Sequence, residues 1–328
     1  YQEMVDDLLW GFAPAPGSLV VDIGCNDGIT LGRYPVGKYK LVGVEPSSSG
    51  EYAVKAGFTV EKRFFDAETA RDMRAIYGGA SIITATNVFA HVDNIRRFTE
   101  GIAILLANDG MFVIEFPYLR DMIEHLYFDT IYHEHLSYLA LTPLMRLFSD
   151  HGLRPFKVQH VDVGASGPAL RLHVCLHKAA HMTDGSIAEM LMAERVWGVN
   201  RIETYSDFAD RVAALRNEML RIVRALNESG RKVGAYGAPA KGNTMLNYLG
   251  VTRNDIVAVA ENNSLKIGKL TPGTHLPVVS DEDFLRLGIS HALLLTWNYA
   301  EFFLANSDFV KKGGKFIVPF PRPAVLPA

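Results

Sequence analysis

Cysteine is scarce in this sequence, and a disulfide or zinc framework is the first thing its scarcity excludes. The 328 residues contain two cysteines, Cys25 and Cys175, both in apolar strand-like contexts, and no C-x-x-C pair. We therefore expect reduced thiols, and the sequence holds no thiolate zinc motif. Long hydrophobic runs are missing too: stretches such as HALLLTW are far shorter than a membrane span.

An excess of one charge is also absent. The sequence has 33 lysines and arginines against 36 aspartates and glutamates, a formal net charge of −3. This balance argues against nucleic acid or an anionic membrane as a partner. No signal-peptide pattern is visible and the sequence begins at Tyr1 rather than Met, so we expect a trimmed N-terminus and a cytoplasmic protein. The length suits two domains, and 48% hydrophobic residues suit sizeable cores.

The dinucleotide fingerprint G-x-G-x-x-G is missing after the first predicted strand. SLVVDIGCNDGITL, residues 18–31, reads as a β-branched strand, a glycine-containing turn and a possible helix start. This is how the first strand of a doubly wound sheet ends. Its turn has the pattern Asp22-x-Gly24-x-x-x-Gly28, with Asn26 inside it. The glycine pattern alone is a weak signal.

Two further acids follow the next two predicted strands. Glu45 ends KLVGVEPS, about 20 residues after the loop, where a carboxylate can accept two hydrogen bonds from ribose hydroxyls. Asp66 follows the short strand in FTVEKRFFDAE and is placed to reach an adenine amino group. Each acid alone also fits a solvated strand end or a helix cap. Their succession favours a nucleoside pocket without a phosphate cradle.

Periodicity predicts the rest of the first half. We expect strands at 80–92 and 109–118, a helix at 96–107, and a hairpin of 156–163 and 169–177 joined by GASGP at 164–168. Five βα units closed by an antiparallel hairpin describe the fold of class I methyltransferases, and the acidic loop with Glu45 and Asp66 resembles their S-adenosylmethionine site. The resemblance implies S-adenosylmethionine as the cofactor.

The second half predicts another, smaller Rossmann-like domain. Residues 186–229 have apolar side chains at helical spacing and predict two connecting helices. Further strands are expected within 231–237, 255–263, 291–299 and 314–320, and helices after the turn at 237–241 and within 281–288 and 301–313. The predicted domains are 1–180 for the cofactor, 181–230 as a helical connector and 231–328 for the nucleotide part of the substrate.

A glycine-rich turn in this second domain suggests a phosphate contact. In GAYGAPAKGN, Gly234, Gly237 and the helix start near Lys241 can present N–H groups and one cation to a pyrophosphate, with Asn243 nearby. The alternative is a tight turn with Lys241 in solvent.

The stretch FDTIYHEHLSYLAL, residues 128–141, places polar side chains in an otherwise apolar run. A metal site, an acid–base site and a polar turn with satisfied hydrogen bonds are the alternatives. In an extended segment His133 and His135 share one face, and His125 or Glu115 offers a third ligand. No helical H-E-x-x-H motif is present, so we predict no metal.

Several motifs together are similar to one enzyme family. TNVFAH, EFPYLRDMIEHLYFDTIYHEHLSY, GAYGAPAKGN and TWNYAE resemble the sugar C-methyltransferases that act on nucleotide-linked 4-keto-deoxysugars, and the resemblance covers essentially the whole chain. It implies that Tyr132, Glu134 and His135 line the active site and that Asn87 and His91 face the sugar. Tyr118, in the EFPY motif, is expected at the substrate. His133 is expected to be structural or to act in support.

The residue types suit methylation of a carbon, expected at carbon 3 beside the ketone. A proton must leave that carbon, and a neutral histidine suits its abstraction. We expect His135 as the base, Glu134 as its orienting partner, and Tyr132 and His91 around the keto and enolate oxygens. Which of His91, Tyr132 and His135 takes the proton stays open.

One departure from the family affects the expected substrate cover. Family members usually carry an N-terminal zinc-binding domain with four cysteines, which this sequence lacks. Either the sequence is a piece of a longer chain or this branch has no such domain. Two other functions remain as alternatives: an NAD-dependent dehydrogenase or epimerase using the second glycine-rich turn with Glu261, and a non-catalytic nucleotide-sugar-binding module.

Overall fold

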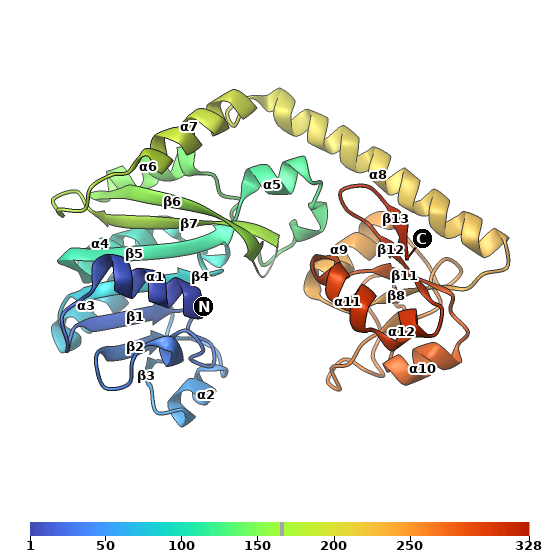
Figure 1. Cartoon of the computed structure of the whole chain (residues 1–328), viewed down its shortest axis with the longest axis horizontal. Coiled ribbons are helices and arrows are strands. Elements are labelled where there is room, and N and C mark those ends of the chain that lie inside the picture. Colours follow the sequence, from blue (N-terminus) through green and yellow to red (C-terminus); the bar gives the residue numbers. More distant parts are fainter. Residues whose placement is uncertain (165–166, 328) are drawn as a thin grey trace. The chain divides into compact units, whose positions relative to one another are not determined.

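A computed structural model describes residues 1–164 and 167–327, and the chain divides into two compact units (Figure 1). The first unit comprises residues 1–119 and 136–200. The second comprises residues 120–135 and 201–328. The segment 120–135 therefore groups with the second unit, whereas the range 1–180 predicted from the sequence assigned it to the first.

The first unit is built on a seven-stranded sheet with the order β3-β2-β1-β4-β5-β7-β6. The strands are β1 (Leu19–Ile23), β2 (Lys40–Val44), β3 (Thr59–Glu61), β4 (Ala80–Thr86), β5 (Leu106–Pro117), β6 (Leu153–Gly164) and β7 (Gly167–Leu176). β1 to β5 are parallel, and β7 runs antiparallel to both β5 and β6. This arrangement confirms the predicted class I methyltransferase fold, including its closing hairpin. Residues 165 and 166 of the predicted GASGP turn lie outside the described residues.

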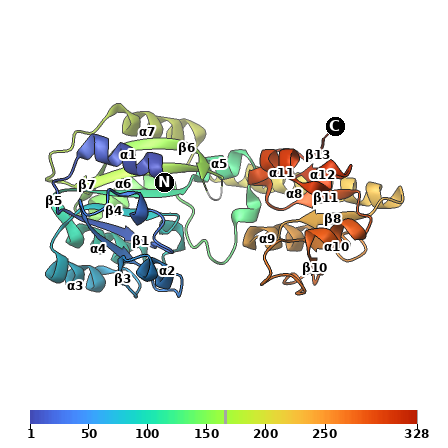
Figure 2. The same cartoon turned by 60° about the horizontal axis from the view of Figure 1, so that its bottom comes forward.

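Helices cover both faces of this sheet. They are α1 (Gln2–Phe12), η1 (Leu31–Arg33), α2 (Gly50–Lys55), α3 (Ala67–Tyr77), η2 (Phe89–His91), α4 (Ile95–Leu105), α6 (Leu141–Asp150) and α7 (Gly185–Trp197). Figure 2 shows α3 and α4 side by side along the sheet. The helix expected directly after β1 is wrong: only the three-residue 3-10 helix η1 follows.

Alternation along the strands explains why apolar side chains pack on both faces of this sheet. Leu19 and Val21 of β1 pack with the side chains of α4, whereas Val20 between them packs with α1 through Met4 and Val5. Successive side chains of a strand point to opposite faces. A strand buried on both faces therefore reads as the continuous apolar run that the sequence contains.

The second unit is built on a six-stranded sheet with the order β10-β9-β8-β11-β12-β13. The strands are β8 (Val233–Tyr236), β9 (Val259–Ala260), β10 (Val278–Val279), β11 (His291–Leu294), β12 (Lys315–Val318) and β13 (Ala324–Leu326). The helices are α8 (Ile202–Glu228), α9 (Ala240–Leu249), α10 (Asp281–Arg286), η4 (Trp297–Tyr299), α11 (Ala300–Asn306) and α12 (Asp308–Lys311). β13 is antiparallel to β12, and the remaining pairs are parallel. The predicted Rossmann-like architecture of this half is present.

The segment 120–135 carries most of α5 (Leu119–Glu124) and all of η3 (Phe128–Thr130). Leu126 and Phe128 are buried in the core of the second unit, with side chains of α8 and α9. Burial of these apolar groups holds the segment to this unit.

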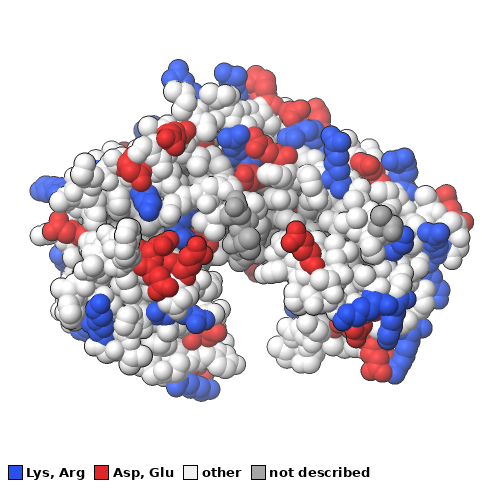
Figure 3. Space-filling view, viewed as in Figure 1, with Lys and Arg blue, Asp and Glu red and all other residues white. Residues whose placement is uncertain are grey.

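The two helices predicted as a connector belong to different units. α7 lies in the first unit, where the fully buried Glu194 accepts hydrogen bonds from the N–H groups of Leu141 and Thr142 at 2.7 Å. α6 has no side-chain cap of its own, so Glu194 caps it from α7. α8 packs in the second unit. In the described residues no helix is both long and apolar enough to cross a membrane, and both signs of charge occur on the surface of each unit (Figure 3).

Candidate active site

The loops that follow three neighbouring strands of the first unit meet at one edge of its sheet. β1 pairs in parallel with β2 on one side and β4 on the other. The strands end at Ile23, Val44 and Thr86, so the loops after them start side by side. In doubly wound sheets this edge, where the strand order reverses, is the place for ligands.

Glycines permit a close approach of these loops. Gly24 has φ +70°, and a Cβ there would lie 2.3 Å from Cγ2 of Val88 in the loop after β4. Gly28 has φ +84°, and its Cβ would lie 2.8 Å from Cδ2 of Phe58. Side chains other than hydrogen fit neither the backbone conformation nor the space. The D-x-G-x-x-x-G pattern therefore has a packing reason at both glycines.

Two asparagines near this edge adopt the left-handed conformation. Asn26 has φ 51° and Asn87 has φ 56°. The N–H of Asn87 donates to the carbonyl of Glu115 at 2.8 Å, which ties the loop after β4 to β5. Asparagine tolerates this region better than most residues, but it still costs free energy, and such strain gathers at functional sites.

Glu45 links the loops after β1 and β2. Its side chain is buried, with Oε2 accepting the N–H of Asn26 at 3.2 Å and Oε1 accepting the N–H of Ser47 at 2.9 Å. A carboxylate has about four acceptor positions. Glu45 can thus hold both loops and still accept further hydrogen bonds.

Asp22 is buried at the end of β1. The hydroxyl of Thr84 donates to its Oδ1 at 2.6 Å. Burial raises the pKa of Asp22 to about 7, although hydrogen bonds from Thr84 and Thr30 oppose the shift. A carboxyl group at this edge therefore titrates near neutral pH.

Asp66 acts as the N-cap of α3. Its Oδ1 accepts the N–H groups of Glu68 and Thr69 at 3.0 and 2.9 Å, and its Oδ2 accepts Arg97 at 3.0 Å. The hydrogen bond from the Thr69 N–H, opposed by desolvation and helped by Arg97, lowers the pKa of Asp66. The helix-cap alternative is what the structure contains, and the contact with adenine stays a prediction.

The polar stretch after β5 folds as a turn on the second unit. His135 is buried, and its Nδ1 lies 2.8 Å from the carbonyl oxygen of Thr130. A carbonyl only accepts, so Nδ1 of the neutral ring carries the proton and Nε2 is its basic nitrogen. The ring of Tyr132 lies 4.5 Å from that of His135, centroid to centroid.

Glu134 does not orient His135 as predicted. The orienting contact comes from the Thr130 carbonyl. Glu134 and His133 are both exposed. A contact of Glu134 with the substrate and a supporting role of His133 stay predictions.

The two residues predicted after β4 lie in the first unit. Asn87 follows β4 directly, and His91 ends η2, where it is exposed. The N–H groups of Leu136 and Ser137 donate to the carbonyl of Ala90 at 2.8 and 3.1 Å. Tyr118 is buried in the core of the same unit, with its hydroxyl donating to Sδ of Met190 at 3.3 Å.

Lys241 is engaged with protein groups rather than solvated. Its Nζ donates to Oδ1 of Asn298 at 2.8 Å and lies 4.0 Å from the ring centroid of Trp297. Burial lowers the pKa of Lys241 to about 8, and the charge of Asp129 opposes this shift. The alternative that placed Lys241 in solvent is therefore wrong, and the pyrophosphate contact stays a prediction.

The turn before Lys241 is as tight as its glycines suggest. Gly237 has φ +81°, and a Cβ there would lie 2.6 Å from Cγ2 of Thr296. Asn243, one turn into α9, accepts the side-chain amide of Asn247 on its carbonyl at 2.7 Å. Glu261 at the end of β9 accepts the N–H of Ala238 at 3.0 Å. Its carboxylate thus anchors this turn as Glu45 anchors the loop after β1.

Asp129 is a buried acid of this turn that no sequence motif singled out. Its side chain is fully buried in η3, and Trp297 Nε1 donates to its Oδ2 at 2.7 Å. Burial raises the pKa of Asp129 to about 6, against the opposing charge of Lys241. An acid within a largely apolar run was the available signal, but its partner lies 168 residues away in sequence.

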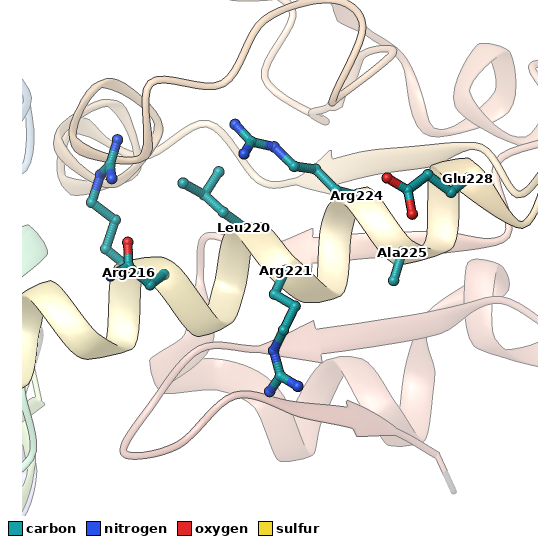
Figure 4. Close-up of a pocket in the computed structure, with 7 residues that line it drawn as sticks. Arg216, Leu220, Arg221, Arg224, Ala225 and Glu228 are labelled. Carbon is teal, nitrogen blue, oxygen red and sulfur yellow. The ribbon is translucent and has the colours of Figure 1, made fainter.

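A depression on α8, lined by residues between Arg216 and Glu228, contains none of the site residues described above. It is lined by one helix only, and Figure 4 shows Arg221 and Arg224 leaving that helix in different directions. Arg216 donates to the carbonyl of Tyr248 at 2.7 Å. These side chains do not converge on one point. Across residues 1–164 and 167–327, no three His, Cys, Asp or Glu side chains are grouped to hold a metal ion.

Comparison with known proteins assigns the family. Residues 2–158 match the family described as a methyltransferase domain, and residues 164–321 match the one described as a C-methyltransferase C-terminal domain. The C-methyltransferase NovU of Streptomyces niveus is 34% identical over 336 aligned positions, which cover 100% of this chain and 78% of the relative.

Similar solved structures cover about half of the chain. One is an S-adenosylmethionine-dependent methyltransferase from Anabaena variabilis, with 16% identity, a TM-score of 0.42, and 53% of this chain and 83% of that chain covered. Another is the magnesium protoporphyrin IX methyltransferase of Synechocystis, with 15% identity, a TM-score of 0.38, and coverage of 53% and 78%. Since the match to the C-methyltransferase extends over the whole sequence, the chain belongs to the S-adenosylmethionine-dependent C-methyltransferases.

Proposed function

We propose that this enzyme is cytoplasmic and methylates the carbon next to the ketone, carbon 3, of a nucleotide-linked 4-keto-deoxysugar. The reaction begins with base-catalysed formation of an enolate. The family membership favours methyl transfer over the NAD-dependent and non-catalytic alternatives. The nature of the substrate rests on the resemblance of the motifs around Tyr132 and Lys241 and on the chemistry below.

The contact between Nδ1 of His135 and the carbonyl oxygen of Thr130, at 2.8 Å, is the observation that carries the mechanism. The hydrogen bond from Nδ1 to the carbonyl of Thr130 makes Nε2 the nitrogen that accepts a proton. A buried and oriented imidazole is suited, in its neutral form, to remove a proton from a carbon that a neighbouring ketone already acidifies. The electrons of the broken C–H bond then move to the ketone oxygen and form the enolate.

Hydrogen-bond donors stabilise the developing enolate oxygen. The phenol of Tyr132 is our first candidate, because its ring lies against that of His135. We propose that His91 and Asn87, in the loop after β4, contact the sugar. Glu134, exposed on the same turn as the base, is proposed to bind a substrate hydroxyl rather than to orient His135. We propose that Tyr118 shapes the substrate site from the core.

The loops of the first unit fit the cofactor. Glu45 has acceptor capacity for ribose hydroxyls beyond its two backbone N–H partners. We propose that Asp22, Gly24, Asn26 and Gly28 line the remainder of the pocket, where a Cβ on either glycine would collide with neighbouring loops. Asp66 is proposed to bind the adenine amino group. When bound, S-adenosylmethionine supplies the methyl group.

The second unit is proposed to hold the nucleotide part of the substrate. Gly237 keeps the turn before α9 tight, and Lys241 and Asn243 follow in the first turn of the helix. The ammonium of Lys241 donates to Asn298, so a phosphate would compete with or share that donor. Lys241→Ala should therefore raise the apparent constant for the sugar substrate far more than that for the cofactor.

Exchange of the substrate's carbon-bound proton tests the proposed base directly. A panel of nucleotide-linked 4-keto-sugars is first screened by mass spectrometry for the gain of one methylene. Exchange of the proton at carbon 3 is then followed by NMR in heavy water with S-adenosylhomocysteine bound, so that no methyl group is transferred. Wild type should exchange this proton.

His135→Gln should lose about 10²–10⁴-fold in exchange and turnover, because general-base catalysis is typically worth that much. His133→Gln is the matched control, because it removes an exposed imidazole two residues away. If His135→Gln exchanges at the wild-type rate while Tyr132→Phe or His91→Gln does not, the base is one of those residues. If methylation proceeds without exchange in wild type, the stepwise enolate mechanism is wrong.

A further inference from the structure

A buried acid, Asp129, lies on the turn that orients the proposed base. Its side chain is fully buried in η3. Burying a carboxylate is costly unless hydrogen bonds and an opposite charge compensate. Trp297 Nε1 donates to its Oδ2 at 2.7 Å, while Oδ1 is buried without a hydrogen-bond partner among the described residues. Trp297 thus supplies the side-chain donor that gives this carboxyl group its direction, and the backbone N–H groups of Asp129 and Thr130 also favour its charged form.

That donor is itself held firmly. The indole of Trp297 is largely buried and stacks on Tyr127, with ring centroids 4.2 Å apart, and Phe320 meets it edge-on at 5.0 Å. Lys241 Nζ lies 4.0 Å from the indole centroid and donates to Asn298. Cation–π attraction and stacking both act on the same ring. Trp297 is therefore a rigid anchor in the second unit.

The anchored residue is adjacent to the carbonyl that binds His135. Thr130 follows Asp129 directly, and its hydroxyl and N–H both donate to the carbonyl of Tyr127, at 2.7 and 3.2 Å. Its own carbonyl accepts Nδ1 of His135 at 2.8 Å. This carbonyl belongs to the peptide unit that follows Thr130, so a change in the backbone dihedrals at Asp129 or Thr130 would turn it away from the imidazole.

We propose that Asp129, locked by Trp297, is a positioning residue that fixes the tautomer and direction of His135. The inference rests on the proposed role of His135 as the base. A purely structural role explains the arrangement less well, because apolar side chains of similar volume usually stabilise a core at least as well as a buried charge. Because a hydrogen bond is directional, a carboxylate bound to Trp297 can fix the orientation of its turn, which an apolar side chain does not.

The test reads the state of the imidazole rather than activity alone. The full chain is labelled with ¹⁵N-histidine and saturated with S-adenosylhomocysteine, and His135 is assigned by comparison with His135→Gln. Two variants weaken the lock: Trp297→Phe removes the donor but keeps an aromatic ring, and Asp129→Asn removes the charge but keeps the shape. Asp255→Asn is the matched control, because Asp255 accepts hydrogen bonds from Thr252 elsewhere in the same unit.

In wild type and Asp255→Asn we expect one tautomer of His135, protonated at Nδ1. In Trp297→Phe and Asp129→Asn we expect a mixture of both tautomers, and a turnover reduced about 10–100-fold, the scale of a misplaced catalytic group, with an unchanged constant for the cofactor. A single Nδ1-protonated tautomer in both lock variants overturns the inference, and so does an equal mixture in Asp255→Asn.

The spectrum requires no substrate, so this result is separable from the proposed function. If no nucleotide-linked keto-sugar is methylated but the tautomer changes as expected, the substrate is misassigned and the positioning role stands. If methylation proceeds and the tautomer does not respond to either lock variant, the positioning role is wrong and the function stands.

Discussion

Replacing Glu45 with glutamine should weaken cofactor binding by a predictable amount. In the structure Glu45 Oε1 and Oε2 each accept one backbone N–H, from Ser47 and Asn26. Glutamine has nearly the same shape but only one acceptor oxygen and no charge. One of the two loop N–H groups therefore loses its acceptor, and any hydroxyl bound by the carboxylate loses a charge-assisted partner.

The magnitude follows from the difference between charged and neutral hydrogen bonds. A hydrogen bond to a charged group contributes about 1.5–3 kcal/mol, and a neutral one about 0.5–1.5 kcal/mol. With two ribose hydroxyls weakened by about 1 kcal/mol each, the loss is about 2 kcal/mol. This corresponds to a dissociation constant about 30-fold higher, since about 1.4 kcal/mol is tenfold.

Calorimetric titration of Glu45→Gln with S-adenosylhomocysteine measures this directly. The control is Glu261→Gln. Glu261 follows β9 in the second unit and accepts the N–H of Ala238 in the turn after β8, as Glu45 follows β2 and accepts the N–H of Asn26 in the loop after β1. Wild-type affinity in a folded Glu45→Gln variant would place the ribose elsewhere. An equal loss in both variants would trace the effect to general destabilisation.

Three other changes give separate tests. Gly24→Ala should destabilise the fold by about 1–3 kcal/mol in urea unfolding and abolish cofactor binding, because its Cβ would lie 2.3 Å from Val88. Adding Val88→Ala should recover part of the stability, and full stability of the single variant would contradict the geometry. Glu194→Gln should cost about 2–4 kcal/mol, since a buried carboxylate caps α6, whereas the exposed Glu189→Gln on the same helix should cost little. Asp22→Asn should be more stabilising at pH 8 than at pH 5: burial raises the folded pKa to about 7 from 3.8, so the folded wild type binds the extra proton and its free energy of unfolding falls as pH rises between these values. A difference in stability that is independent of pH would refute this last expectation.

Sequence patterns predicted what depends on local order along the chain. The strands of the first unit could be read from apolar runs, and Glu45 from its place after the second of them. Period-2 alternation also predicted the antiparallel pair that closes the sheet. The helix expected after β1 failed because glycines in left-handed conformation and a short 3-10 turn occupy that stretch. Helical propensity there is overridden by the loop that the neighbouring strands require.

Long-range partners were beyond the reach of the sequence. The role of Asp129 depends on Trp297, and the cap of α6 depends on Glu194, 53 positions after the N–H that it accepts. Neither pair leaves a spacing signal. The strands β9 and β10 are two residues each, too short for alternation to be seen, and β13 pairs with β12 only through the fold. Secondary-structure propensity reflects residues close together in sequence, whereas these contacts are set by the topology of the fold.

The discontinuous chain of the second unit has a consequence for its synthesis. Leu126 and Phe128 leave the ribosome before any residue of 201–328, with which they later form a core. The first unit is complete in sequence at residue 200, so it can fold while this apolar segment still awaits its partners. A fragment that starts at residue 201 would lack these two side chains and expose the apolar surface that they cover. A truncated variant of the second unit should therefore include residues 120–135 as well as 201–328.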